Sequence, residues 1–353
     1  MDKIKVAING FGRIGRQAFK IALDKPEIQI VGINDLTEPN VLAHLLKYDS
    51  AYGVYHKKVS ADDKHEKANQ TITSVGTIIV DGVKVPIFAE KDPAVLPWKD
   101  LDVDVVLEST GRFTDSEKAS AHIKAGAKKV IISAPAKDEG ITPTFIIGVN
   151  SDKYDAKQTI LSNASCTTNC ITPVIAVMHS KFGIKKMLMS TIHSYTAEQN
   201  LVDGPPPGGK SNDLRRARAA AENIIPTSTG ATIATTEVIP DLKGLLGGAS
   251  YRVPTIVGSL SDFSLLLNKK VTVDEVNKAF IEAARHPMWE HVIEVTNDPI
   301  VSKDIVGNPH SAIIDLSLTQ VVDGDLVKVV AWYDNEFGYS NRLVEQAILV
   351  GKA

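Results

Sequence analysis

The sequence predicts an α/β protein with an N-terminal domain built on a parallel sheet, followed by an α+β domain with a mixed or antiparallel sheet. Strand and helix patterns alternate over the first third of the chain, which is typical of a parallel sheet with helices on both faces. After residue 166, strands and helices follow each other without that regular order. The length of 353 residues is also large for a single hydrophobic core and favours two domains.

Hydrophobic periodicity places the individual elements. In the first domain the expected strands are 3–9, 28–34, 103–109 and 129–133, and the expected helices are 13–23 and 115–126. The stretch 56–90 interrupts this order with a polar segment and a VDGVK turn, which predicts an antiparallel excursion. In the second domain the expected strands are 186–192, 252–268, 313–321 and 326–333, and the expected helices are 167–181, 273–285 and the C-terminal stretch.

Composition and charge narrow the class of protein. Apolar residues make up 43% of the chain, and the net charge of −3 argues against a general nucleic-acid surface. The two cysteines, Cys166 and Cys170, are too few for a disulfide framework. The first residues lack the pattern of a signal peptide, and no apolar run reaches the ~20 residues of a membrane span. We expect a cytoplasmic protein whose main partner is neither a membrane nor a nucleic acid.

A glycine pattern follows the first expected strand, where Gly10, Gly12 and Gly15 form G-x-G-x-x-G. In a Rossmann-type site these glycines permit a tight turn, admit a pyrophosphate and let the helix pack on the strand. The helix N-terminus then attracts the phosphates. Asp35 ends the second strand, where a carboxylate accepts hydrogen bonds from a ribose hydroxyl and repels a 2′-phosphate. The pattern predicts a site for NAD rather than NADP, although a plain glycine-rich turn is the alternative.

A cysteine and a histidine form the candidate catalytic pair. Cys166 lies at the expected start of a helix, where free N–H groups favour a thiolate, whereas Cys170 lies one turn deeper and is expected to be buried. His193 follows an apolar strand, from which an imidazole could pair with the thiolate and move protons. Packing roles are the alternative for both. No metal site is expected, because these residues do not complete a set of four ligands.

Polar segments that flank the later strands hold candidate anion-binding residues. These are Thr196, Arg216, Thr229, Gly230 and Arg252. Arginine combined with hydroxyl and backbone N–H groups is a common way to hold phosphate. The basic run LRRAR is equally compatible with a solvated helix face or a nucleic-acid patch, and periodicity alone does not choose between them.

Several strings together resemble the glyceraldehyde-3-phosphate dehydrogenase family. They are INGFGRIGR, SNASCTTNC, STIHSY, DLRRARAAAENIIPTSTGA, SYRVPT and WYDNEFGYSNR, and the likeness runs from residue 3 to about 350. The resemblance implies NAD-dependent oxidative phosphorylation of D-glyceraldehyde 3-phosphate to 1,3-bisphosphoglycerate, in glycolysis and gluconeogenesis. The reaction would pass through a cysteine thiohemiacetal and a thioester in a homotetramer. Inorganic phosphate would be the second substrate.

The resemblance also implies a role for each matching residue. Cys166 would be the nucleophile and His193 its base. The substrate phosphate would contact Thr196, Arg216 and Arg252, and the attacking phosphate Ser165, Thr167, Thr229 and Gly230. The cofactor would contact Arg13, Ile14, Asp35, Thr110 and Ser133 beside the glycine turn, with Asn335 on the nicotinamide amide. The NAD-binding Rossmann domain would comprise 1–165 and 334–353, and the catalytic domain 166–333.

Two rival functions remain compatible with the sequence. One is an erythrose-4-phosphate dehydrogenase of the same fold, which would retain the thiol and the histidine but hydrolyse the acyl intermediate. The other is a non-catalytic relative that binds NAD or RNA. Two segments also depart from the family pattern: the proline-rich loop 204–212 is longer than in many relatives, and 57–70 matches loosely. The loop therefore carries no argument on coenzyme preference.

Overall fold

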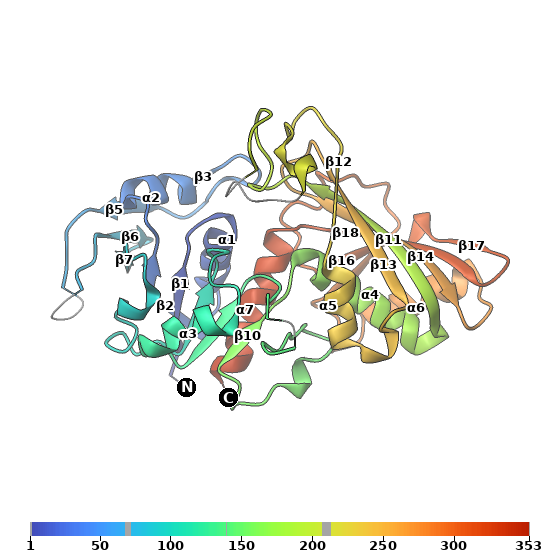
Figure 1. The fold of residues 1–353 in the computed structure, drawn as a ribbon, viewed down its shortest axis with the longest axis horizontal. Helices are drawn as coiled ribbons and strands as arrows, with labels where there is room; N and C mark the ends of the chain where they lie inside the picture. Colours follow the sequence, from blue (N-terminus) through green and yellow to red (C-terminus); the bar gives the residue numbers. More distant parts are fainter. Residues whose placement is uncertain (1, 68–71, 139, 207–212, 353) are drawn as a thin grey trace. The chain divides into compact units, whose positions relative to one another are not determined.

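The computed structural model describes residues 2–67, 72–138, 140–206 and 213–352. They form two compact units (Figure 1). The first unit comprises Met1–Phe145, Ser151–Ala164 and Ser340–Ala353, and the second comprises Ile146–Asn150 and Ser165–Tyr339. Part of the proline-rich loop, 207–212, and residues 68–70 of the loosely matched segment lie outside the described residues.

The first unit is built on an eight-stranded sheet with the order β10-β9-β8-β1-β2-β7-β6-β5. Neighbours from β10 to β7 are parallel, and β6 and β5 are antiparallel, which confirms the predicted parallel sheet with its antiparallel excursion. The strands are β1 (Ile4–Asn9), β2 (Ile28–Asn34), β5 (Val59–Asp62), β6 (Gly76–Val80), β7 (Val83–Phe88), β8 (Val105–Glu108), β9 (Lys129–Ile132) and β10 (Ile160–Ser162). A separate short pair consists of β3 (Tyr48–Asp49) and β4 (Gly53–Val54).

The helices of the first unit each follow a strand along the chain, and the last of them is the C-terminal element. They are α1 (Arg13–Ala22), α2 (Pro39–Lys47), α3 (Ser116–Lys124) and most of α7 (Phe337–Gly351). The sequence prediction missed α2, a short helix that begins with proline, the residue favoured in a first turn. The last turn of α7 packs tightly on β1, since a Cβ on Gly351 would lie 2.5 Å from the Ile4 side chain.

The second unit is built on a mixed sheet, as predicted. The order is β12-β13-β11-β14-β18-β16-β15, with β17 beside β18. The pairs β11–β13 and β15–β16 are parallel and the other pairs antiparallel. The strands are β11 (Ile184–Ser194), β12 (Ile225–Thr227), β13 (Leu246–Val253), β14 (Ser259–Leu267), β15 (Ile293–Thr296), β16 (Ala312–Asp315), β17 (Gln320–Val322) and β18 (Leu326–Tyr333).

The single strand predicted over 252–268 is wrong. β13 begins earlier, at Leu246, and ends at Val253, and a turn separates it from β14. Pro254 has no N–H to continue a ladder. Gly258 adopts a positive φ of 100°, and a Cβ there would lie 2.3 Å from the Ser302 carbonyl oxygen. The predicted strand 313–321 is likewise interrupted, by a 3-10 turn at Leu316–Leu318.

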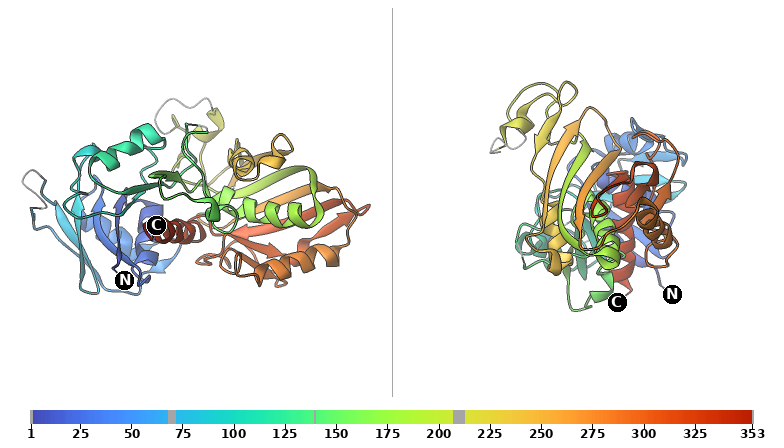
Figure 2. Two further views of the ribbon diagram at one scale, coloured as in Figure 1. Left: turned by 90° about the horizontal axis from the view of Figure 1, so that it is seen from below. Right: turned by 90° about the vertical axis from the view of Figure 1, so that its right-hand side faces the viewer.

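Three helices pack on one face of the second sheet: α4 (Cys166–Phe182), α5 (Ala231–Val238) and α6 (Val273–Ala284). Figure 2 shows α4 and α6 beside its strands. Thr272 begins α6 with a capping box, because its side chain and Glu275 satisfy each other's backbone N–H. None of the described helices is long and apolar enough to cross a bilayer.

Candidate active site

The glycine turn between β1 and α1 shows what the chain requires at each of its three glycines. Gly10 has a φ of 92°, and a Cβ there would lie 2.8 Å from the Thr110 backbone nitrogen. A Cβ on Gly15 would lie 2.1 Å from the Gly10 carbonyl oxygen, so the helix can approach the strand only without one. A Cβ on Gly12 would meet no described atom within 4 Å, so nothing in the described chain itself requires glycine there. That open space suits the close approach of a ligand to the backbone.

A pocket of about 360 Å³ opens where β1, β2 and β8 end. It is lined by Asn9, Gly10, Gly12, Asn34, Asp35, Leu36, Glu90, Lys91, Ser109, Thr110, Arg112 and Phe113. The Asp35 carboxylate accepts hydrogen bonds from the Phe11 backbone N–H at 2.7 Å and the Thr37 backbone N–H at 2.9 Å. The sequence-predicted Gly10, Gly12, Asp35 and Thr110 are thus brought together in one pocket.

The other residues of the predicted cofactor site, which are Arg13, Ile14, Gly15, Ser133 and Asn335, are not among those that line this pocket. Arg13 ion-pairs with Asp49 at 2.7 Å. Ile14 is half-buried in the first turn of α1, and Ser133 follows β9. Arg13, for which the resemblance implies a cofactor contact, thus pairs with a buried carboxylate of the chain itself.

Behind the pocket lies a buried polar network that the sequence did not reveal. One Glu108 carboxylate oxygen accepts from the Asn9 amide at 2.6 Å and lies 3.0 Å from His122 Nε2, while the other accepts from both the backbone N–H and the hydroxyl of Thr110. The Trp98 indole donates to His122 Nδ1 at 3.0 Å. Because an indole N–H can only donate, Nδ1 carries the lone pair and Nε2 donates to Glu108. Glu108 therefore ties the ends of β1 and β8 together beneath the pocket.

The second unit holds the candidate nucleophile. Cys166 is the first residue of α4, and Ser165 caps this helix by accepting a hydrogen bond from the Thr168 N–H at 3.1 Å. Ala164, just before the cap, is buried with a φ of 53°, a conformation that non-glycine residues rarely adopt. Cys170 is fully buried one turn deeper, as expected. The local chain thus presents Cys166, and not Cys170, at the mouth of the helix.

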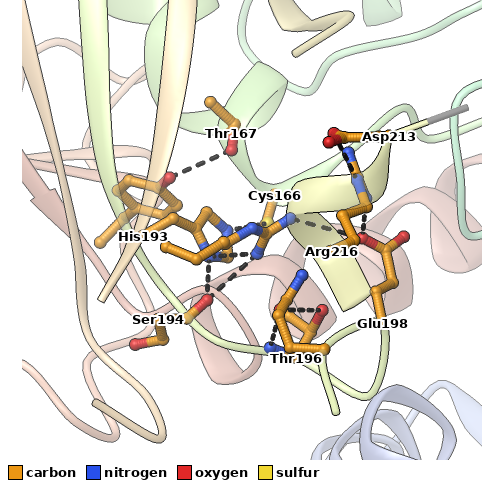
Figure 3. A network of polar contacts seen from close by, with 11 residues as sticks. Cys166, Thr167, His193, Ser194, Thr196, Glu198, Asp213 and Arg216 are labelled. Atoms are coloured by element: carbon orange, nitrogen blue, oxygen red, sulfur yellow. Dashed lines mark hydrogen bonds and ion pairs between the residues drawn. The ribbon is translucent and has the colours of Figure 1, made fainter. Parts of the chain in front are cut away.

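His193 meets the thiol directly, since its Nε2 lies 3.4 Å from Cys166 Sγ (Figure 3). Its Nδ1 lies 2.7 Å from both the Ser194 carbonyl oxygen and an Arg252 guanidinium nitrogen. The arginine can only donate and the carbonyl can only accept. When Nδ1 donates its proton to Ser194, the lone pair of Nε2 faces the thiol and can accept its proton.

Burial sets the protonation of this pair. It raises the pKa of the Cys166 thiol, although the positive charge of Arg252 and hydrogen bonds at the helix start oppose this shift. Burial, assisted by Arg252, lowers the pKa of His193 to about 3. The imidazole is therefore neutral at physiological pH and available as a base. The thiolate expected from the helix N-terminus is not favoured in the free chain, because desolvation outweighs the helix.

Candidate anion-binding residues lie beside Cys166 and His193, and strand register explains the position of one of them. His193 on β11 is the parallel partner of Arg252 on β13. Arg216 joins them through Glu198, whose carboxylate ion-pairs with Arg216 and lies 3.7 Å from Arg252. Thr196 follows β11 on the same side of the network (Figure 3). The sequence indicated the arginines but not the acid between them.

The remaining predicted residues lie in three different parts of the second unit. The Thr167 hydroxyl forms a hydrogen bond with the Tyr333 hydroxyl at 3.1 Å. The Tyr333 ring also packs edge-to-face with the His193 ring. Thr229 and Gly230 immediately precede α5, where the Thr229 hydroxyl accepts from the Ala231 N–H. Asn335 is buried. Its side-chain oxygen Oδ1 accepts from the Gly258 N–H at 3.1 Å and the Ser259 hydroxyl at 3.0 Å, so the direction of the side-chain amide is fixed within the second unit.

Among the described residues no group of three or more histidine, cysteine or acidic side chains is arranged to hold a metal ion. Cys166 and His193 instead form a pair backed by an arginine, with hydroxyl groups nearby. A thiol at a helix start that faces a neutral imidazole can add to a carbonyl carbon and lose its proton to that imidazole. The adjacent cations can hold a phosphorylated substrate.

Comparisons with known proteins agree with this geometry. Residues 4–116 match the family model described as "Glyceraldehyde 3-phosphate dehydrogenase, NAD binding domain", and residues 165–335 match its C-terminal domain. The chain is 49% identical over 350 residues to glyceraldehyde-3-phosphate dehydrogenase 1 of Bacillus subtilis, covering 99% of this chain and 98% of the relative. Glyceraldehyde-3-phosphate dehydrogenase of Mycobacterium tuberculosis is 51% identical over 356 residues, with 99% of both chains covered. The chain therefore belongs to the glyceraldehyde 3-phosphate dehydrogenase family.

Proposed function

We propose that the protein catalyses the NAD-dependent oxidative phosphorylation of D-glyceraldehyde 3-phosphate to 1,3-bisphosphoglycerate. The observation that carries this proposal is the 3.4 Å approach of Cys166 Sγ to His193 Nε2 at the start of α4. The proposal is also supported by sequence identities of 49% and 51%, over 99% of the chain, to dehydrogenases named for this substrate. In this role the enzyme serves glycolysis and gluconeogenesis in the cytoplasm.

The residues of the first unit fit NAD. Gly12 leaves room for a pyrophosphate. The Asp35 carboxylate in the same pocket can accept a hydrogen bond from a ribose hydroxyl and would repel a 2′-phosphate. NAD, when bound, accepts a hydride from the substrate carbon. The proposed cofactor contacts are Gly10, Gly12, Arg13, Ile14, Gly15, Asp35, Thr110 and Ser133, with Asn335 on the nicotinamide amide.

The chemistry belongs to Cys166 and His193. The sulfur adds to the aldehyde carbon as His193 Nε2 takes the thiol proton and passes it to the carbonyl oxygen, which gives a thiohemiacetal and leaves the imidazole neutral. His193 then accepts the proton of the new hydroxyl as a hydride leaves the same carbon, and a thioester remains. An oxygen of inorganic phosphate attacks the thioester and the carbon–sulfur bond breaks, so that the acyl phosphate is released. The Cys166 sulfur then takes the proton back from His193, which restores the thiol and the neutral imidazole. The thioester retains the free energy of aldehyde oxidation for this transfer.

Two groups of residues are proposed to hold the phosphates. Thr196, Arg216 and Arg252 would bind the phosphate of the sugar. Ser165, Thr167, Thr229 and Gly230 would bind the attacking phosphate. The arginine charges supply long-range attraction, and the hydroxyl and backbone N–H groups supply direction.

Phosphate dependence tests the proposed reaction. With glyceraldehyde 3-phosphate and NAD, steady NADH formation should require inorganic phosphate, because the thioester otherwise stays on Cys166. Erythrose 4-phosphate should be oxidised much more slowly. NADH formation that proceeds equally well without phosphate, or faster with the four-carbon sugar, would contradict the proposal and favour the hydrolysing rival.

The assembly proposed for this enzyme is a homotetramer. In support, the face of the second sheet opposite α4 carries exposed apolar side chains, among them Leu188, which is 70% exposed, and Leu326. With neighbouring strand residues they line a hollow of about 560 Å³. Apolar surfaces of this kind favour association with another chain. Light scattering on the purified protein should give the mass of four chains, and a monomeric mass at micromolar concentration would refute the tetramer.

A further inference from the structure

Glu198 occupies a particular place among the anion-binding residues. One carboxylate oxygen, Oε2, ion-pairs with Arg216 and lies 3.7 Å from an Arg252 guanidinium nitrogen (Figure 3). The Glu198 side chain is 56% exposed, whereas the arginine side chains are 21% and 14% exposed. A single anionic oxygen on the solvent side therefore faces two guanidinium groups.

The other contacts of these arginines leave one Arg252 donor without a hydrogen bond among the described residues. Arg216 Nε is held by Asp213 at 3.2 Å. Arg252 donates to the Ser194 carbonyl oxygen at 3.1 Å, and its Nε is buried without a hydrogen-bond partner among the described residues. At 3.7 Å Glu198 attracts Arg252 but makes no hydrogen bond to it. Arg252 is thus incompletely satisfied in the free chain.

We propose that Glu198 is a specificity-determining residue that holds the place of a substrate phosphate oxygen and is displaced when a phosphorylated aldehyde binds. This inference rests on the proposed function. A phosphate brings nearly two charges and three oxygens, against one charge and two oxygens of the carboxylate. It can therefore displace Glu198 and hydrogen-bond both arginines. A weaker or singly charged anion competes poorly, so Glu198 rejects it.

The Glu198→Gln variant tests this role, because it removes the charge and retains the shape. We expect the KM for glyceraldehyde 3-phosphate to fall roughly two- to fivefold, the range of an exposed ion pair, with kcat little changed. The KM for D-glyceraldehyde, which has no phosphate, should not move. Inhibition by sulfate should strengthen. An unchanged or higher KM for the phosphorylated aldehyde would overturn the proposal, since it would make Glu198 inert or a support for Arg216.

Asp203→Asn is the matched control. Asp203 is 56% exposed, like Glu198, and it ion-pairs with Arg218 rather than with Arg216 or Arg252. The same charge change at this position should alter neither the KM values nor sulfate inhibition. A fall in KM equal to that of Glu198→Gln would attribute the effect to net charge and overturn the proposal.

Sulfate binding separates this inference from the proposed function. If the wild-type protein formed no NADH from glyceraldehyde 3-phosphate, NAD and phosphate, the proposed function would fail. Calorimetry with sulfate would still decide the role of Glu198. Tighter binding by Glu198→Gln than by the wild type and Asp203→Asn supports it, and equal binding overturns it.

Discussion

Replacing Cys166 by serine should abolish NADH formation, with a loss on the order of 10³-fold or more, while NAD binding persists. The hydroxyl is a far weaker nucleophile than the thiol, and its oxyester would not hold the energy of a thioester. NADH absorbance measures the loss, and calorimetry measures NAD binding. Cys170→Ala is the control, because Cys170 is buried one turn deeper and should affect packing only. Wild-type turnover by Cys166→Ser would remove the thiol mechanism.

The pH dependence of alkylation should report the state of the same thiol. Because burial raises the pKa of Cys166, the protonated form predominates at neutral pH, and the rate with iodoacetamide should climb as pH rises past the ordinary thiol range. His193, with a pKa of about 3, contributes no step near neutrality. A rate that is already maximal in mild acid would reveal a preformed thiolate and contradict this assignment.

Replacing His193 by asparagine should lower kcat by ~10²–10⁴-fold, the usual contribution of a positioned base. Asparagine keeps a polar group near Cys166 but cannot accept a proton. Stopped-flow measurement of the first NADH formed isolates the oxidation step, where the loss should appear. His291→Asn, on an exposed side chain, should retain full activity. A variant His193→Asn with wild-type kcat would show that another group takes the proton.

Local patterns were sufficient to predict the parallel sheet of the first unit and its glycine turn, although not α2. The strand β1, the glycine turn and α1 are contiguous, so their sequence alone specifies the close approach of Gly15 to Gly10. Asp35 follows at a fixed distance along the chain. The thiol at the start of α4 was predictable for the same reason, because Ser165 and Cys166 are neighbours and the cap needs no distant partner.

Contacts made by strand pairing were not predictable in this way. β13 was missed over most of its length because Gly247 and Gly248 weaken its strand pattern. The prediction therefore placed Arg252 at the beginning of a strand, whereas it lies near the end of one. Only the parallel pairing of β13 with β11 reveals that Arg252 meets His193.

The buried network around Glu108 and the ion pairs of Glu198 could not be predicted from the sequence, for a related reason. Glu108, His122 and Trp98 come from a strand, a helix and a loop, and no spacing links them. Glu198 likewise resembles any solvated acid until the fold places two arginines around it. Pairing energies of such groups depend on three-dimensional proximity, which a linear pattern does not encode.

The alignment of His193 with Arg252 also constrains how these two strands can change. Side chains alternate between the two faces of a sheet, so inserting or deleting one residue within β13 before Arg252 would turn its guanidinium to the opposite side. Single substitutions are therefore the available means of tuning the imidazole, and length changes must fall in the connections outside the paired segment.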